Sequence, residues 1–132
     1  MDDPQHLIPY VVLSLLRREK PVMTQGEQRW DYLYVEDAAT AIYQAVTSPC
    51  AQGVFNLGSG QITTIKSIVE RIRDLIDPEL PLGLGEIPYR PDQIMHLQAD
   101  VSLLYKATGW KPQVSLEDGL ERTVKWYREN CG

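Results

Sequence analysis

The chain has 132 residues, of which 43% are hydrophobic and 23% charged, and its net charge at pH 7 is −5. This length predicts one domain, residues 1–132, which can bury roughly two thirds of the surface of its unfolded chain. The acidic balance, without a cluster of Lys and Arg, argues against a nucleic-acid partner, and no apolar run is long enough for a membrane span.

The cysteines and the N-terminus bear on where in the cell the protein is expected. Cys50 and Cys131 lie far apart, in neither the spacing of a zinc site nor the density of a disulfide scaffold. The first ten residues are acidic and lack the basic and apolar regions of a signal peptide. His6 and His96 have no metal-binding spacing. We therefore expect a cytoplasmic protein without a metal site.

The first half of the chain alternates helices and short strands. Apolar residues at helical spacing run over 8–17 and predict a helix whose first residue is Pro9. Strands are predicted at 22–24 and 31–35. Asp37 is the predicted cap of the next helix, which ends before Ser48. One apolar stripe runs along that helix: Ala39, Ile42, Tyr43 and Val46.

The second half follows the same alternation. A strand is predicted at 53–57, and a helix capped by Thr63 or Thr64 follows, with one apolar face made of Ile65, Ile68, Val69, Ile72 and Ile76. Its Pro and Gly residues make 78–91 a loop, with one strand near 85–87. A strand at 94–99 and a helix at 101–108 that ends at Gly109 come next. Ser115 and Asp118 open the last helix, and four residues point inward from it: Leu116, Leu120, Val124 and Tyr127.

These elements predict a fold class and suggest a missing partner. Short strands without a long Val/Ile run do not form the centre of a large parallel sheet. We therefore expect a small mixed α/β domain of helices and short strands, comparable to the smaller, lid-like part of an α/β enzyme. The abrupt start suggests that an N-terminal partner is missing.

Two arginines are candidate ligands for an anion. Arg29 stands beside an aromatic group, and a strand would place Trp30, Tyr32 and Tyr34 on one face and Arg29 with Asp31 and Leu33 on the other. Such a surface can hold a phosphate and stack a base, but the residues alone favour aromatic core positions, with Arg29 as a surface charge paired to Asp31. Arg90 stands between Pro88 and Pro91, in a rigid loop that suits an anionic ligand, or it pairs with Asp92 on the surface.

Two further motifs are interpreted as structural. Gly58-Ser59-Gly60 precedes a helix, but it lacks the third Gly of a dinucleotide fingerprint and the Lys of a P-loop, which favours a plain turn. His96 alternates with Ile94 and Gln98 and is interpreted as a strand residue rather than a base.

Several segments together resemble one family. GEQRWDYLYVEDAATAI, then GVFNLGSG, then YRPDQIMHLQADVSLLYKATGWKP and a final amphipathic helix are similar to the C-terminal half of an extended short-chain dehydrogenase/reductase. The similarity is greatest to the NAD-dependent nucleotide-sugar epimerases and dehydratases, and it covers almost the whole chain.

The resemblance implies a division of labour between two lobes. A large Rossmann domain binds NAD(P) and carries a catalytic Tyr-x-x-x-Lys, and a smaller C-terminal lobe closes over the nucleotide-diphosphate sugar. This sequence contains neither Tyr-x-x-x-Lys nor GxxGxxG. It is therefore expected to be the C-terminal lobe of a Rossmann-type protein whose Rossmann domain is missing, with no catalytic or cofactor-binding residue of its own, and to be inactive alone.

The resemblance also implies substrate-binding residues. Leu7, Ile8 and Pro9 match a segment near the nucleotide, Val22 and Met23 a strand along the base, and Arg90 the arginine that grips the diphosphate. Two departures stand out. Many family members have Arg-Asp where this chain has Arg29-Trp30-Asp31, so either Arg29 or Trp30 meets the ligand, together with Tyr32. Gln93 replaces a carboxylate that holds the ribose in some members.

Three functions follow from these observations. The first is a nucleotide-sugar-binding lobe of such an enzyme. The second is a stand-alone binding module, and the third is an interaction protein that forms a homodimer through the surface a Rossmann domain would cover. The nucleotide, the sugar and the choice among epimerase, dehydratase and reductase are not determined by this sequence.

Overall fold

The computed structural model describes residues 6–49, 53 and 56–131, and this part contains five helices and five two-residue strands. The helices are α1 (Leu7–Leu16), α2 (Val35–Thr47), α3 (Ile65–Ile76), α4 (Ser102–Thr108) and α5 (Leu116–Cys131). The strands are β1 (Val22–Met23), β2 (Arg29–Trp30), β3 (Thr63–Thr64), β4 (Gly83–Leu84) and β5 (His96–Leu97). The structure is thus the small α/β domain with short strands that the sequence predicts.

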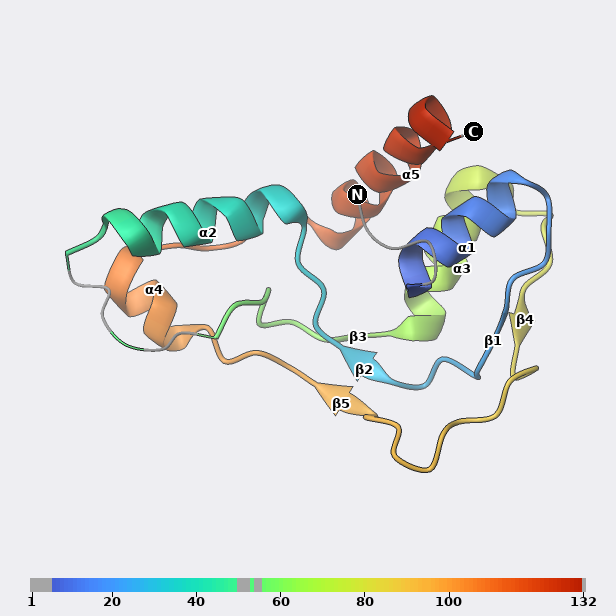
Figure 1. Cartoon of the computed structure of the whole chain (residues 1–132), viewed down its shortest axis with the longest axis horizontal. Helices are drawn as coiled ribbons and strands as arrows, with labels where there is room; N and C mark the ends of the chain where they lie inside the picture. Colours follow the sequence, from blue (N-terminus) through green and yellow to red (C-terminus); the bar gives the residue numbers. More distant parts are fainter. Residues whose placement is uncertain (1–5, 50–52, 54–55, 132) are drawn as a thin grey trace.

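The strands form two small sheets. β1 pairs in parallel with β4, and β2 lies between β3, which is antiparallel, and β5, which is parallel. Figure 1 shows the three-stranded sheet between α1, α3 and α5 on one side and the pair α2 and α4 on the other. The chain crosses from one group of helices to the other directly after β2, so residues 31–34 join the two halves of the fold.

The larger hydrophobic cluster is built from α1, α3 and α5. α3 begins where the Thr64 hydroxyl accepts a hydrogen bond from the amide of Ser67 at 3.2 Å, as predicted for a cap. The predicted face of α3 is buried, with Ile68, Val69 and Ile72 fully enclosed. Each such side chain contributes about 1.5–3 kcal/mol when it leaves water. The inward positions predicted for α5 pack against the same cluster.

The smaller cluster joins α2 and α4. It contains Ala41, Leu104 and Trp110, with Leu33 and Val101 packed against them. α4 ends at Gly109, whose φ of 74° is a left-handed conformation that glycine adopts without strain. This end is the one predicted from sequence, and it turns the chain so that Trp110 enters the cluster.

Three predicted elements differ from the structure. The strand expected at 31–35 is wrong, because the pairing falls on Arg29 and Trp30, where β3 and β5 supply partners on both sides. The strand expected near 85–87 lies two residues earlier, at β4, where β1 is its partner. The strand expected at 53–57 does not form at the positions described there, Gly53, Asn56 and Leu57, and residues 54–55 lie outside the described part of the chain.

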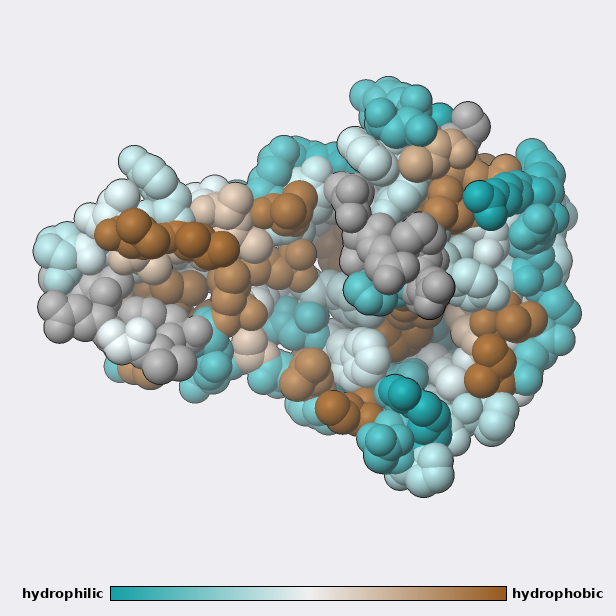
Figure 2. Space-filling model, viewed as in Figure 1, coloured by the Kyte–Doolittle hydropathy of each residue, from teal (hydrophilic) through white to brown (hydrophobic). Residues whose placement is uncertain are grey.

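The apolar stripe of α2 is exposed to solvent. Ile42, Tyr43 and Val46 are 58%, 69% and 80% exposed. Val35, two helical turns before Ile42 on the same side of α2, is 58% exposed. Figure 2 shows brown, hydrophobic atoms gathered along α2. Only Ala41 among the apolar residues of the helix is fully buried. α2 therefore turns its least polar side away from the rest of the described chain.

Candidate functional site

A hollow of about 280 Å³ at the start of α1 brings several of the predicted ligand-binding residues together. It is lined by His6, Leu7, Ile8, Trp30 and Tyr32. α1 supplies two of these side chains from its first turn, and β2 with the connection after it supplies the two aromatic residues. Trp30 and Tyr32 lie on the same side of the chain, as alternation predicts.

The structure separates Arg29 from Trp30. The indole N–H of Trp30 donates to the carbonyl of Ile94 at 2.9 Å, which holds the ring against the hollow. Arg29 is exposed, and its backbone amide donates to the carbonyl of Met95 at 2.8 Å. Within the described part of the chain, Arg29 has no ion pair with Asp31. Trp30, rather than Arg29, is therefore the residue that faces the hollow.

Tyr32 has a neutral, poorly hydrated hydroxyl. Burial raises the pKa of Tyr32 to about 12, because the phenolate loses the stabilisation that water would provide. The ring packs against the larger hydrophobic cluster. Near neutral pH this side chain therefore offers an aromatic face and a hydroxyl, and it does not act as a base.

The remaining predicted residues do not line the hollow. Pro9 and Met23 are buried, and Val22 is 37% exposed, with its amide donating to the Tyr10 hydroxyl at 3.1 Å. Arg90 is exposed in a turn closed by a hydrogen bond from the Gln93 amide to its carbonyl at 3.1 Å. No ion pair joins Arg90 to Asp92 among the described residues, so its guanidinium faces solvent.

Asp31 organises the segments next to the hollow. Its carboxylate accepts hydrogen bonds from the backbone amides of Ser59 at 2.7 Å, Gly60 at 2.8 Å and Ala99 at 3.3 Å. The Gly58-Ser59-Gly60 turn therefore binds an internal carboxylate, which confirms its structural interpretation. A Cβ at Gly58 would lie 2.6 Å from that of Ala99, so only glycine fits there. Sequence reasoning missed this role of Asp31, because its partners are distant in sequence.

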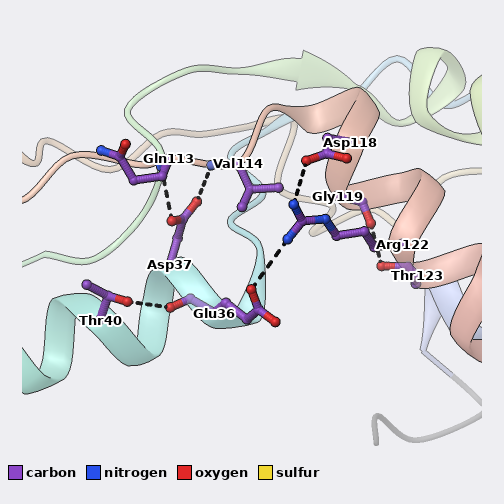
Figure 3. Close-up of polar contacts among 9 residues, drawn as sticks. All are labelled: Glu36, Asp37, Thr40, Gln113, Val114, Asp118, Gly119, Arg122 and Thr123. Carbon is purple, nitrogen blue, oxygen red and sulfur yellow. Dashed lines mark hydrogen bonds and ion pairs between the residues drawn. The ribbon is translucent and has the colours of Figure 1, made fainter.

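Asp37 has a similar role in the other half of the molecule. It is 4% exposed, and its carboxylate accepts the amides of Gln113 at 3.0 Å and Val114 at 2.9 Å (Figure 3). Its carbonyl accepts the indole N–H of Trp110 at 3.1 Å. The prediction that Asp37 caps α2 is wrong, since the cap residue is Tyr34 and Asp37 lies in the first turn. The side chain points instead to the segment between α4 and α5.

Arg122 ties α5 to the start of α2. Its guanidinium lies 3.0 Å from the carboxylate of Asp118 and 3.4 Å from that of Glu36 (Figure 3), and 5.6 Å from the centre of the Tyr34 ring. The charge of Asp118 is the main cause that raises the pKa of Arg122, followed by smaller contributions from Tyr34 and Glu36. These contacts are exposed and therefore contribute little to stability.

A second and larger cavity, of about 710 Å³, opens between the two hydrophobic clusters. It shares Ile8 and Tyr32 with the small hollow, and its far wall is the segment from Trp110 to Leu116. Apart from Ile8, Tyr32 and Tyr34, sequence reasoning assigned no ligand-binding role to its lining. Its walls come from five separate segments, so no local pattern could have revealed it.

Two general features of the described residues can be stated here. Within them, no three His, Cys, Asp or Glu side chains come close enough together to hold a metal ion. None of the helices that the structure describes is both long and apolar enough to cross a membrane.

Known proteins resemble this chain over almost its whole length. Residues 1–58 match the model of the NAD dependent epimerase/dehydratase family. dTDP-glucose 4,6-dehydratase 1 of Escherichia coli strain K12 is 36% identical over 134 residues, covering 96% of this chain and 37% of the relative.

Solved structures extend the match to three dimensions. The UDP-N-acetylglucosamine 4-epimerase of Methanobrevibacter ruminantium M1, in complex with UDP-N-acetylmuramic acid, is 31% identical with a TM-score of 0.86 over 97% of this chain and 41% of its own. dTDP-glucose 4,6-dehydratase of Bacillus anthracis strain Ames, in complex with NAD, shares the fold with a TM-score of 0.85 at 24% identity, over 96% of this chain and 40% of its own.

The chain matches part of the NAD-dependent epimerase/dehydratase family. It spans about 37% of the length of the Escherichia coli relative. The five helices and short mixed strands therefore correspond to one part of the fold of these family members, and most of each relative lies outside the match.

Proposed function

We propose that this chain is the C-terminal, nucleotide-diphosphate-sugar-binding lobe of an NAD-dependent nucleotide-sugar epimerase or dehydratase. The observation that carries the proposal is the convergence of Leu7, Ile8, Trp30 and Tyr32 on one hollow. The first two match a family segment near the nucleotide, and the aromatic rings offer faces on which a base can stack. The epimerase complex with UDP-N-acetylmuramic acid supports a ligand of this class.

The proposal divides the ligand between two surfaces. The base or sugar stacks on Trp30, where many family members carry an arginine, and Arg90 grips the diphosphate from the turn beside Gln93. The exposed guanidinium of Arg90 is free to swing toward an anion. Val22, Met23 and Pro9 form the backing of the site, and Arg29 lies outside it.

In this proposal the lobe performs no chemistry alone. NAD(P) and the Tyr-x-x-x-Lys base belong to the NAD-binding part of the family, which supplies hydride transfer and proton abstraction when it is present. The residues of this chain contribute by binding and orienting the nucleotide sugar. We further propose a cytoplasmic location.

Isothermal titration tests the proposal with UDP, dTDP, CDP and GDP and their glucose conjugates. We expect one nucleotide to bind and Trp30→Ala and Arg90→Ala each to weaken it about tenfold or more, since each removes one direct contact. Trp126→Ala and Arg29→Ala are matched controls that leave binding within about twofold. Equal losses for the controls, or no nucleotide binding at up to millimolar concentration, would contradict independent binding by the lobe.

A second candidate function, protein interaction, is favoured by the exposed stripe of α2. Residues 38–47 contain no charged side chain, and the three most exposed apolar residues there are Ile42, Tyr43 and Val46. An uncharged, apolar helix face of this kind is typical of an interface. We propose that the NAD-binding part of the family covers this face, and that a second copy covers it when the chain is alone.

Sedimentation velocity tests the second candidate. We expect a concentration-dependent dimer that Val46→Glu with Tyr43→Lys converts to a monomer, because each change places a charge in the interface. Leu103→Glu, at an exposed position of α4 (61%), is the control and leaves the dimer intact. A strictly monomeric wild-type chain at 100 μM or above would exclude self-association through α2.

A further inference from the structure

The larger cavity is not accounted for by the proposed nucleotide site. Of the residues proposed to hold the nucleotide sugar, only Ile8 and Tyr32 reach it, and they form its boundary with the small hollow. Its volume of about 710 Å³ lies within the range of small-molecule sites, roughly 300–1,000 Å³. The question is which ligand its walls would accept.

The walls are held in place by internal hydrogen bonds. The carboxylate of Asp31 fixes Ser59 on one side, and the carboxylate of Asp37 fixes Gln113 and Val114 on the other. All three fixed residues line the cavity. One wall is anchored to Asp31 and the other to Asp37, at the two ends of the 31–37 segment. The cavity is therefore pre-formed, and a ligand would not have to order it.

The lining is aromatic and carries a single charge. Four aromatic rings border the cavity, from Tyr32, Tyr34, Tyr105 and Trp110. Among the described residues that line it, Lys111 is the only charged one, and its ammonium lies 5.0 Å from the centre of the Tyr105 ring. No ion pair with an acid holds Lys111 within the described part of the chain, so its charge is available at the rim.

We propose that this cavity is a second binding site, for a small aromatic anion. The rings and Leu33 enclose a flat aromatic group, and Lys111 pairs with a carboxylate, sulfonate or phosphate at the mouth. A cationic ligand would meet no acidic side chain in the lining, and a neutral one would gain no ion pair with Lys111. Among ligands of the same shape, the positive charge of Lys111 therefore favours the anionic one.

A titration followed by amide NMR spectra tests this directly. The probes are 1-naphthoate and its neutral counterpart 1-naphthamide, which match in shape. We expect naphthoate to shift amides in residues 59–63 and 110–116 and to bind about tenfold more tightly than the amide, as for a charge-assisted contact. Equal affinities for the two probes, or shifts confined to α2, would overturn the proposal.

Variants separate the charge from the cavity. Lys111→Gln should abolish the preference for naphthoate, whereas Lys106→Gln, an exposed residue of α4 outside the lining, should leave it unchanged. Thr123→Trp should fill the cavity and weaken both probes more than 100-fold. If that variant does not fold, the Lys111 and Lys106 pair still decides the question, and an unchanged preference in Lys111→Gln refutes the proposal.

Competition with nucleotides separates this proposal from the proposed function. Trp30→Ala should weaken nucleotide binding and leave naphthoate binding within about twofold, because Trp30 lines only the small hollow. Displacement of naphthoate by a nucleoside diphosphate at its own binding concentration would assign the cavity to the nucleotide site. That result would overturn the second site while leaving the nucleotide proposal intact.

Discussion

Replacement of Asp37 by Ala is the sharpest test of how the smaller half of the fold is held together. The carboxylate is 4% exposed and accepts the amides of Gln113 and Val114 at 3.0 and 2.9 Å. The substitution leaves two backbone donors without their acceptor, at about 1–3 kcal/mol each. Partial access of water to these amides reduces the sum, so we expect a loss of roughly 3 kcal/mol in the free energy of unfolding.

Urea denaturation followed by circular dichroism measures this loss. Asp37→Asn keeps the shape and one acceptor, and we expect it to lose about half as much. Glu36→Ala removes the neighbouring acid, whose side chain is 69% exposed and pairs with Arg122 at 3.4 Å, so its loss should stay below about 1 kcal/mol. Hydrogen exchange should speed up at the amides of Gln113 and Val114 in the Asp37 variants alone. Equal free energies of unfolding for Asp37→Ala and Glu36→Ala would refute this reasoning.

Three further predictions concern the core, the turn and the site. Ile68→Ala, at a fully buried position of α3, should lower the free energy of unfolding by about 2–5 kcal/mol in urea, whereas a loss below 1 kcal/mol would contradict the described packing. Gly58→Ala should destabilise by more than 1 kcal/mol, because its Cβ would lie 2.6 Å from that of Ala99; a neutral effect would count against this turn. The folded pKa of Tyr32, about 12, exceeds its unfolded value near 10, so its contribution to stability is complete below pH 10 and is lost as pH rises toward 12. Tyr32→Phe should therefore flatten the loss of stability between pH 10 and 12, and parallel curves for wild type and variant would refute the shift.

The helices were predictable from sequence because their signals are local. The cap of α3 at Thr64 and the end of α4 at Gly109 each depend on residues within one turn. The buried face of α3 follows from apolar spacing within the helix itself. For the same reason the order of helices and strands, and hence the small α/β class, could be predicted before the structure was known.

The strands and the carboxylates were less predictable because their partners are distant in sequence. The pattern after Gln28 predicts an extended segment, but pairing with β3 and β5 places the strand at Arg29 and Trp30. Asp37 has the sequence signature of a cap, yet its carboxylate oxygens accept hydrogen bonds from backbone amides 76 and 77 residues away. Short-range patterns do not report such contacts.

The candidate site shows the same division. The sequence and its family resemblance single out Leu7, Ile8, Trp30 and Tyr32 as ligand-binding candidates, and the structure brings these four to one hollow. Whether Arg29 or Trp30 turns toward it was open, because a shift of one residue along a strand reverses the facing. In the structure Trp30 faces the hollow, and its indole N–H is held by a hydrogen bond to the carbonyl of Ile94.

The sequence by itself determined the helices, the small α/β class and the absence of Tyr-x-x-x-Lys and GxxGxxG in this chain, since composition, spacing and caps act over a few residues. Only the tertiary structure decided that the α2 stripe faces solvent, that Asp31 and Asp37 anchor distant backbone, and that a cavity opens between the two clusters. Each of these depends on which segments meet in space. A periodic pattern says that a helix has an apolar side, but it does not say what packs against that side.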